Sequence, residues 1–455
     1  MTRHVRRLHL NAFLMTTGHH EASWRLAESD PAAGTSVEHY VRLAKTAERG
    51  TFDSLFLADS PQLLGDAGRR PVGVIEPLTL LTVLAGITDR IGLIATASTT
   101  YNSPYNLARR FASLDHVSGG RAGWNIVTTA TVDAARNFGL PELPDHAQRY
   151  RRAQEFVDVA QKLWDSWDDD AVVADKERGI WADQGRIHPP GHRGEFFDVA
   201  GALNIPRSPQ GYPLLVQAGS SEDGKALAGR FAEAVFTAQQ LLDDGRAFYA
   251  DLKSRARGHG RDPDTIKILP GLVPVIGSTE AEATAAHRRL DEAILPEYAH
   301  RQLATTLKLS VDDLPLDERL PADLLPEDEI EGAKSRYSLI VDLARREDLT
   351  VRGLIARLGG GRGHRTFTGT PEQIADTIAE WFHTGAADGF NVMAPVLPGG
   401  LDLFVDHVVP ILRRRGLFRE SYETSTLRGH YGLARPENQY SPAIGGRDRH
   451  VRAAG

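Results

Sequence analysis

The sequence of 455 residues contains no cysteine, which excludes disulfides, thiolate metal sites, iron–sulfur clusters and cysteine nucleophiles. No apolar run approaches the ~20 residues of a membrane span, and no signal-peptide core follows the first ten residues. Neither sign of charge dominates, because 53 Lys and Arg oppose 60 Asp and Glu, for a net charge of −7. Such a chain has no overall attraction to nucleic acid or anionic lipid. We therefore expect a cytoplasmic protein with neither nucleic acid nor membrane as partner.

Short apolar runs alternate with amphipathic stretches along the chain. The expected strands are 8–14, 54–58, 91–95, 124–127, 213–217, 234–237, 266–276 and 389–394. The expected helices between them are 37–49, 76–88, 106–118, 146–167, 221–230, 241–258 and 371–384. Eight parallel strands with helices between them predict an α/β protein with a (β/α)8 TIM barrel, whose catalytic groups lie after the strands.

Two intervals are too long for one connecting helix and are rich in Pro, Gly and charge. We expect one barrel domain over residues 1–419, with insertions at 168–212 and 278–370, after the fourth and seventh strands. The second holds an acidic stretch at 311–331, a helix over 333–346 and glycines from Gly359 onward, and these predict a mobile lid. Residues 420–455 are polar and rich in Pro and Gly, which predicts a C-terminal tail on the surface or on a partner subunit.

The segment 219–225 reads GSSEDGK after an expected strand and at the start of an expected helix. It resembles the phosphate loop of P-loop NTPases, but Ala226 replaces the Ser or Thr that holds Mg²⁺, which argues against a P-loop ATPase. The backbone of Gly219 and the hydroxyls of Ser220 and Ser221 suit a phosphate at a helix N-terminus. The alternative is a plain helix cap.

Histidines and other polar residues form a second group of candidates. His20 and Glu21 suggest a zinc motif, but Trp24 stands where the second histidine belongs, so no metal site is expected. The pair His19 and His20 follows the first strand and suits substrate binding or proton donation, unless it is plain surface. Further candidates near strand ends or on one helix face are Asp59, Thr96, Tyr101, Asn102, Asn125, His146 and Tyr150.

Several segments, taken in order, resemble one family. They are HLNAF (9–13), FDSLFLAD (52–59), TAST (96–99), LDHVSGGR (114–121), WNIVTT (124–129), NFG (137–139), PRSPQG (206–211) and QAGSS (217–221). The chain resembles the flavin-dependent monooxygenases of the bacterial luciferase superfamily, in the branch of nitrilotriacetate, EDTA and dibenzothiophene-sulfone monooxygenases. The resemblance runs from about residue 9 to residue 436.

The resemblance implies a barrel that binds FMN. The positions that contact the flavin in the family correspond here to Asp59, Thr96, His146, Tyr150, Ser220 and the neighbouring Ser221. It also places His20 near the reactive edge of the flavin, and we expect His20 and Asn125 to be catalytic. The segments expected to bind substrate contribute Phe13, Phe56, Tyr101, Asn102 and Phe236.

The chemistry implied by this resemblance is that of a two-component monooxygenase. Reduced FMN from a separate NAD(P)H-dependent flavin reductase reacts with O₂ to a C4a-(hydro)peroxyflavin, which oxygenates a small organic substrate. The expected pocket is more apolar than basic, which favours an aromatic or organosulfur substrate. A homodimer or homotetramer is expected. The alternatives are a deazaflavin-dependent oxidoreductase of the same superfamily and a non-catalytic flavin-binding protein.

Overall fold

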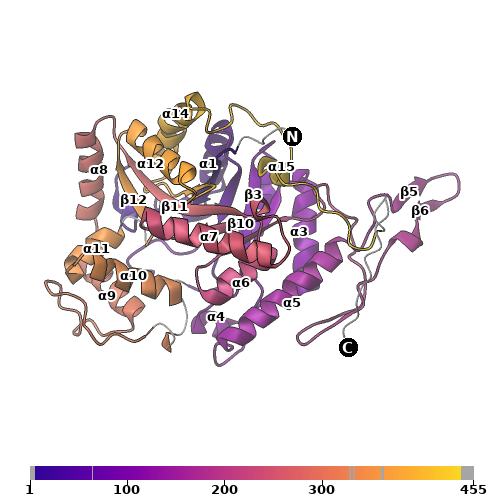
Figure 1. Cartoon of the computed structure of the whole chain (residues 1–455), viewed down its shortest axis with the longest axis horizontal. Coiled ribbons are helices and arrows are strands. Elements are labelled where there is room, and N and C mark those ends of the chain that lie inside the picture. The colour runs from indigo at the N-terminus through magenta and orange to yellow at the C-terminus, as the bar shows by residue number, and fades with distance from the viewer. Residues whose placement is uncertain (1–5, 64, 327–328, 331–333, 360–362, 442–455) are drawn as a thin grey trace.

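The computed structural model describes residues 6–63, 65–326, 329–330, 334–359 and 363–441 (Figure 1). In this part of the chain eight parallel strands form a closed barrel, because β10 pairs with β11 and β13 lies between β11 and β1. These strands are β1 (His9–Leu14), β2 (Ser54–Leu57), β3 (Gly92–Ser98), β4 (Ala122–Val127), β9 (Leu214–Ala218), β10 (Ala234–Thr237), β11 (Lys267–Ile276) and β13 (Gly389–Val392). The TIM-barrel prediction is confirmed, and all eight expected strands are present.

Helices cover the outside of the barrel (Figure 1). They are α1 (Val37–Arg49), α2 (Pro77–Ala85), α3 (Pro104–Ser118), α4 (Val132–Asn137), α5 (His146–Trp164), α6 (Glu222–Phe231), α7 (Leu242–Gly258), α12 (Pro371–His383), α13 (Gly399–Leu403) and α14 (Val409–Arg414). Helix α1 illustrates why these segments form helices that pack on the barrel. Its buried residues recur at helical spacing and are Tyr40, Leu43, Ala44 and Ala47, and the Ser36 side chain caps its N-terminus. In the described residues, no helix is long and apolar enough to cross a bilayer.

The first insertion forms two antiparallel hairpins. Strands β5 (Val172–Asp175) and β6 (Ile180–Ala182) make one, and β7 (His192–Arg193) and β8 (Asp198–Val199) make the other. Figure 1 shows the β5–β6 hairpin projecting away from the barrel.

The described part of the second insertion contains four helices, α8 (Glu280–Glu292), α9 (Pro296–Leu307), α10 (Lys334–Arg346) and α11 (Val351–Gly359). Helices α9, α10 and α11 share a small core of their own, in which Leu307, Tyr337 and Leu354 are buried. The helix expected from residue 333 is α10. Part of the interval is a ninth strand, β12 (Arg365–Gly369), which pairs with the end of the ten-residue β11. Residues 360–362 of the expected glycine cluster lie outside the described residues.

The chain after residue 419 was expected to lie on the surface or on a partner subunit, but part of it closes the barrel. Helix α15 (Leu427–His430) places Leu427 and Tyr431 in the barrel interior, where both are fully buried. Gly92 makes room for this contact, since a Cβ there would lie 2.3 Å from Leu427 Cδ1. The Tyr431 hydroxyl donates to Asn11 Oδ1 at 2.8 Å. Residues 442–455 of the expected tail lie outside the described residues.

A buried carboxylate ties the strands to the same C-terminal segment. Asp53 accepts hydrogen bonds from the backbone N–H of Leu10 at 2.8 Å and from Arg419, and its Oδ1 lies 3.0 Å from His9 Nδ1. Burial would raise the pKa of Asp53, but Arg419 and His9 outweigh burial and hold this pKa well below its usual range.

This network predicts a dependence of stability on pH. Because the folded pKa of Asp53 is lowered, its ionisation stabilises the protein above the unfolded pKa near 4, and this contribution is lost as the pH falls. Asp53→Asn should therefore lower the free energy of unfolding more at pH 7 than at pH 3. The loss at pH 3 should be smaller than the loss at pH 7 by at least about 1 kcal/mol. Urea titrations at the two pH values measure this. An equal difference at both would contradict it.

Candidate active site

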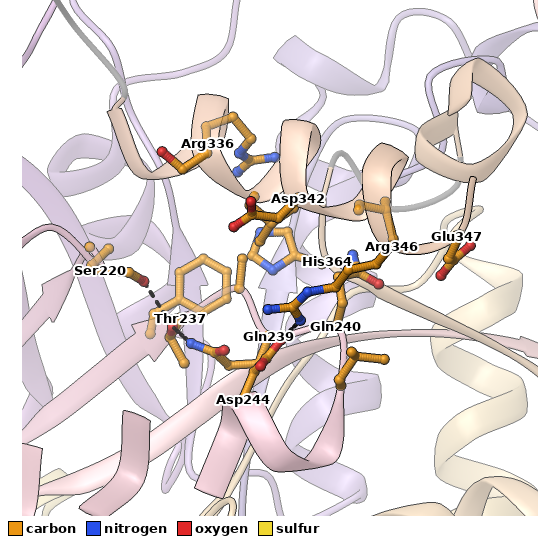
Figure 2. Close-up of a pocket in the computed structure, with 18 residues that line it drawn as sticks. Ser220, Thr237, Gln239, Gln240, Asp244, Arg336, Asp342, Arg346, Glu347 and His364 are labelled. Atoms are coloured by element: carbon orange, nitrogen blue, oxygen red, sulfur yellow. Dashed lines mark hydrogen bonds and ion pairs between the residues drawn. The ribbon is translucent and has the colours of Figure 1, made fainter. Parts of the chain in front are cut away.

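A cavity of about 690 Å³ opens at the carboxyl ends of β9 and β10, beneath α10 of the second insertion (Figure 2). We call it the main cavity. Its described lining consists of Ala218, Gly219, Ser220, Phe236, Thr237, Ala238, Gln239, Gln240, Leu241, Asp244, Arg336, Ser338, Leu339, Asp342, Leu343, Arg346, Glu347 and His364. Ser220 Oγ lies 3.1 Å from Thr237 Oγ1, and Gln239 donates to Thr237, so the strand ends carry a connected polar floor.

A second cavity of about 230 Å³ lies beside the first and shares Ala218 and Gly219 with it. We call it the phosphate cavity, because the sequence predicts that Gly219 and Ser221 bind a phosphate. Its described lining consists of Ile126, Val127, Thr128, Thr129, Ala130, His146, Arg149, Tyr150, Gln217, Ala218, Gly219, Ser221 and Leu227. Three expected cofactor residues, His146, Tyr150 and Ser221, therefore meet in one cavity.

The helix ends at this cavity favour an anion. His146 is the first residue of α5, and Ser221 is the N-cap of α6, whose side chain accepts from the N–H of Gly224 at 3.2 Å. Unpaired N–H groups and the helix dipole make such N-termini positive. Arg149 adds a buried positive charge, although its guanidinium also donates to backbone carbonyls. Asp223 opposes this field only in part, since it pairs with His146 Nδ1 at 2.9 Å.

The backbone at this cavity leaves room close to the hydroxyls. Gly219 has φ +151°, a conformation that residues with a side chain rarely adopt, and it turns the chain from β9 into α6. A Cβ at Gly224 would lie 3.1 Å from Ser221 Oγ and 3.4 Å from the Tyr150 hydroxyl. The two hydroxyls lie 3.4 Å apart. The cradle therefore presents hydroxyl and N–H donors around a space that a side chain would fill.

Two buried amide oxygens near these cavities accept no hydrogen bond from the described residues. They are Oδ1 of Asn125, on β4, and Oε1 of Gln217, on β9. The Asn125 amide nitrogen donates to Thr96 Oγ1 at 2.8 Å, and Thr96 donates to the Leu57 carbonyl, so Asn125 is held in place. Buried acceptors without a donor are costly, and a bound ligand with N–H or O–H groups would satisfy them.

Aromatic side chains extend the main cavity toward the barrel interior. Phe236 stacks on His364, with ring centroids 4.9 Å apart. Phe13 and Phe56 pack against Phe236 from below, at 5.4 and 5.6 Å. Of the expected substrate residues, Phe236 thus lines the cavity, while Phe13 and Phe56 support it from the core.

Three expected residues lie after β2 and β3, outside the described linings of both cavities. Asp59 is half-buried, and its pKa is raised by burial and by Glu76 against a backbone hydrogen bond. Tyr101 stacks on Phe138 with centroids 4.6 Å apart, and Asn102 donates to the Ser98 carbonyl. Their roles stay predictions.

His20 also lies outside the described linings of these two cavities. Its side chain is fully buried, and its Nδ1 accepts from the Ala22 N–H at 3.2 Å, so the neutral ring carries its proton on Nε2. That Nε2 faces Asp291 Oδ1, on α8, at 3.7 Å. Its neighbour His19 hydrogen-bonds the Phe13 carbonyl and packs against the Phe13 ring. His20 therefore joins the loop after β1 to the second insertion, and its catalytic role stays a prediction.

The sequence did not single out several cavity residues. Gln217 and Arg149 adjoin residues that were chosen, and their positions show no local pattern of their own. His364 and Arg336 both come from the second insertion, and only the fold brings them to the barrel.

Together, the barrel and the two joined cavities place the candidate site at the carboxyl ends of the strands, where this fold carries its active sites. Residues 13–388 match the family model described as Luciferase-like monooxygenase. The chain belongs to this family of luciferase-like monooxygenases, and the resemblance seen in its sequence is confirmed.

Two relatives cover nearly the whole chain. N-acetyl-S-(2-succino)cysteine monooxygenase of Bacillus subtilis (strain 168) is 46% identical over 97% of this chain and 100% of its own length. Nitrilotriacetate monooxygenase component A of Aminobacter aminovorans is 46% identical over 95% of this chain and 98% of its own. Among solved structures, riboflavin lyase with modified FMN and the substrate riboflavin is 31% identical, with a TM-score of 0.82 over 94% of this chain and 96% of that one.

Proposed function

We propose that the protein is the oxygenating component of a two-component system. It takes reduced FMN from a separate NAD(P)H-dependent flavin reductase and uses O₂ to oxygenate a small organic substrate, aromatic or organosulfur. The observation that carries this proposal is the phosphate cavity joined to the main cavity through Ala218 and Gly219. The names of two relatives support it, one as "component A" of a monooxygenase and one as acting on a sulfur compound.

The described residues fit FMN. The phosphate would be held by the N-terminus of α6 and by Ser221, Tyr150 and His146. Ser220, which lines the main cavity next to the shared Gly219, would add a further hydrogen bond. The unsatisfied oxygens of Asn125 and Gln217 would accept hydrogen bonds from the flavin. Thr96 and Asp59 would lie nearer the ring, as the family resemblance implies.

Reduced flavin, when bound, supplies the activation of O₂ that allows one oxygen atom to pass to the substrate. The chain's own residues orient the reactants and exclude water. Phe236 and the phenylalanines beneath it present an apolar wall, and α10 roofs the main cavity (Figure 2). Exclusion of water protects the activated oxygen from release as hydrogen peroxide.

The test is a substrate panel of thioethers and aromatic sulfones with O₂, FMN and a generic NADH-dependent flavin reductase. Mass spectrometry is expected to find one added oxygen atom or a cleaved fragment for one class. Reactions with oxidised FMN and no reductase serve as the control. A tightly held flavin that NADH reduces without a reductase would overturn the two-component proposal.

Two adjacent serines allow a matched test of the phosphate site. Ser220→Ala is expected to weaken FMN binding by about 1–2 kcal/mol, the contribution of one hydrogen bond to a charged group, with stability unchanged. Ser221→Ala should weaken FMN binding similarly and also lower stability by about 1 kcal/mol, because Ser221 caps α6. Quenching of FMN fluorescence and thermal unfolding measure the two quantities. If both variants bound FMN as tightly as the parent, the phosphate would have to bind at another place.

A further inference from the structure

A third cavity lies between the barrel loops and the second insertion. We call this space of about 210 Å³ the side cavity. It is walled by apolar side chains of α9, α10 and α11, including Leu303, Ile340 and Leu358. Arg336 of α10 lines both the side cavity and the main cavity, so the two spaces meet at this arginine.

Within the described residues, the charge of Arg336 has no partner. Its side chain is half-buried, and no residue in the described part of the chain accepts a hydrogen bond from it or forms an ion pair with it. Burial lowers the pKa of Arg336 to about 10. A cation removed from water without a compensating anion is destabilising, so its position between two cavities indicates an anionic ligand.

Two other polar groups of the side cavity lack partners in the same way. Tyr298 is 95% buried, given a relative exposure of 5%, and its hydroxyl forms no hydrogen bond with the described residues. Arg70, from the loop after β2, is half-buried, and no described residue pairs with its guanidinium. Gln302 and Thr306 complete the polar lining, and Glu21 is the one carboxylate among the described lining residues.

These observations favour a carboxylate on an organic ligand. Two guanidinium groups and a phenol hydroxyl are hydrogen-bond donors for such a group, and the apolar walls suit a short carbon chain beside it. Because Arg336 also lines the main cavity, a ligand held there extends toward the flavin site. The exposed Asp342 lines the main cavity and not the side cavity, so it does not neutralise the positive charge of the side cavity.

We propose that the substrate carries a carboxylate that Arg336 and Arg70 bind in the side cavity, with the Tyr298 hydroxyl as a third donor, while its reacting part lies in the main cavity. The proposal rests on the proposed function for the reaction itself. It makes Arg336 a specificity-determining residue.

The experiment measures binding rather than turnover, so that it stands apart from the oxygenation test. Isothermal titration of the FMN-loaded protein compares thiodiglycolate with 2,2′-thiodiacetamide, which has the same skeleton without charge. The diacid is expected to bind at least about 10-fold more tightly than the diamide. Arg336→Gln should weaken diacid binding by about 10–100-fold and leave both FMN affinity and diamide binding unchanged.

Two further variants separate recognition from folding. Arg345→Gln removes an exposed charge from the same helix outside the described linings and should bind the diacid like the parent. Tyr298→Phe should weaken diacid binding about 3–10-fold while thermal stability stays equal or rises, since an unsatisfied buried hydroxyl is lost.

Three results would overturn the proposal. One is equal binding of diacid and diamide, or no binding of either at millimolar concentration. Another is a loss of FMN affinity in Arg336→Gln, which would assign the arginine to the flavin. The third is tighter binding of inorganic phosphate than of thiodiglycolate, with the same dependence on Arg336, which would replace the carboxylate by a phosphate ligand. Failure of the oxygenation panel with carboxylate binding intact would instead refute only the proposed function.

Discussion

Replacing Arg428 by methionine is expected to lower the free energy of unfolding by about 3–5 kcal/mol, because it leaves a buried carboxylate without its partner. Arg428, on α15, is fully buried and donates to both carboxylate oxygens of Glu233, to Oε2 at 2.9 Å. Glu233 also accepts from the Leu215 N–H at the start of β9. The midpoint of urea unfolding, followed by tryptophan fluorescence, measures the loss.

The ion pair of Arg7 with Glu423 provides the control, because it lies near the same segment but is exposed. Arg7→Met should change the free energy of unfolding by less than about 1 kcal/mol. The double variant Arg428→Met, Glu233→Gln should cost less than the sum of the two single changes, since it removes the uncompensated charge. A loss below about 1 kcal/mol in Arg428→Met would show that α15 contributes little to the stability of the barrel.

The largest effect on turnover is expected from His20→Ala. Product formation should fall by about 10²–10⁴-fold while FMN affinity is kept, and the O₂ consumed should appear as hydrogen peroxide. The structure supports an effect of His20 through the second insertion, since its Nε2 proton faces Asp291 of α8 across 3.7 Å. The ratio of product to peroxide measures the effect.

Asp291→Asn decides how His20 acts. If His20 positions the insertion over the flavin site, Asp291→Asn should release peroxide as His20→Ala does, because the carboxylate that faces the imidazole is gone. If the imidazole acts directly on oxygen transfer, Asp291→Asn should keep the parent ratio. Parent turnover and no extra peroxide in both variants would mean that His20 has no part in the reaction.

The barrel could be predicted from the sequence because its strands are short continuous apolar runs, as in β10, and the helices between them repeat apolar residues at helical spacing. The strand β12 was missed because it lacks such a run. Its segment RTFTG is only half-buried and pairs at the end of β11, so it has no apolar run to reveal it.

The candidate site could be predicted in part. Ser221 and His146 stand at the starts of two helices, Tyr150 lies one turn after His146, and a helix start is visible in a sequence. Arg336 could not be found in this way, because one arginine in an amphipathic helix resembles a solvated residue until the fold places it between two cavities, with no partner among the described residues. Leu427 and Tyr431 were missed because isolated apolar residues in a polar segment carry no periodic signal.

The burial of Leu427 and Tyr431 in the barrel interior also constrains the order in which contacts form during synthesis. The hydrogen bond from Tyr431 to Asn11 joins residues 420 positions apart, so this contact of the first strand can form only after nearly the whole chain has been made. Contacts of such long sequence separation form late and slowly. During synthesis, the apolar barrel interior that Leu427 and Tyr431 cover therefore stays exposed until residues 427–431 leave the ribosome. In this interval the nascent chain is most prone to aggregation and most in need of chaperones.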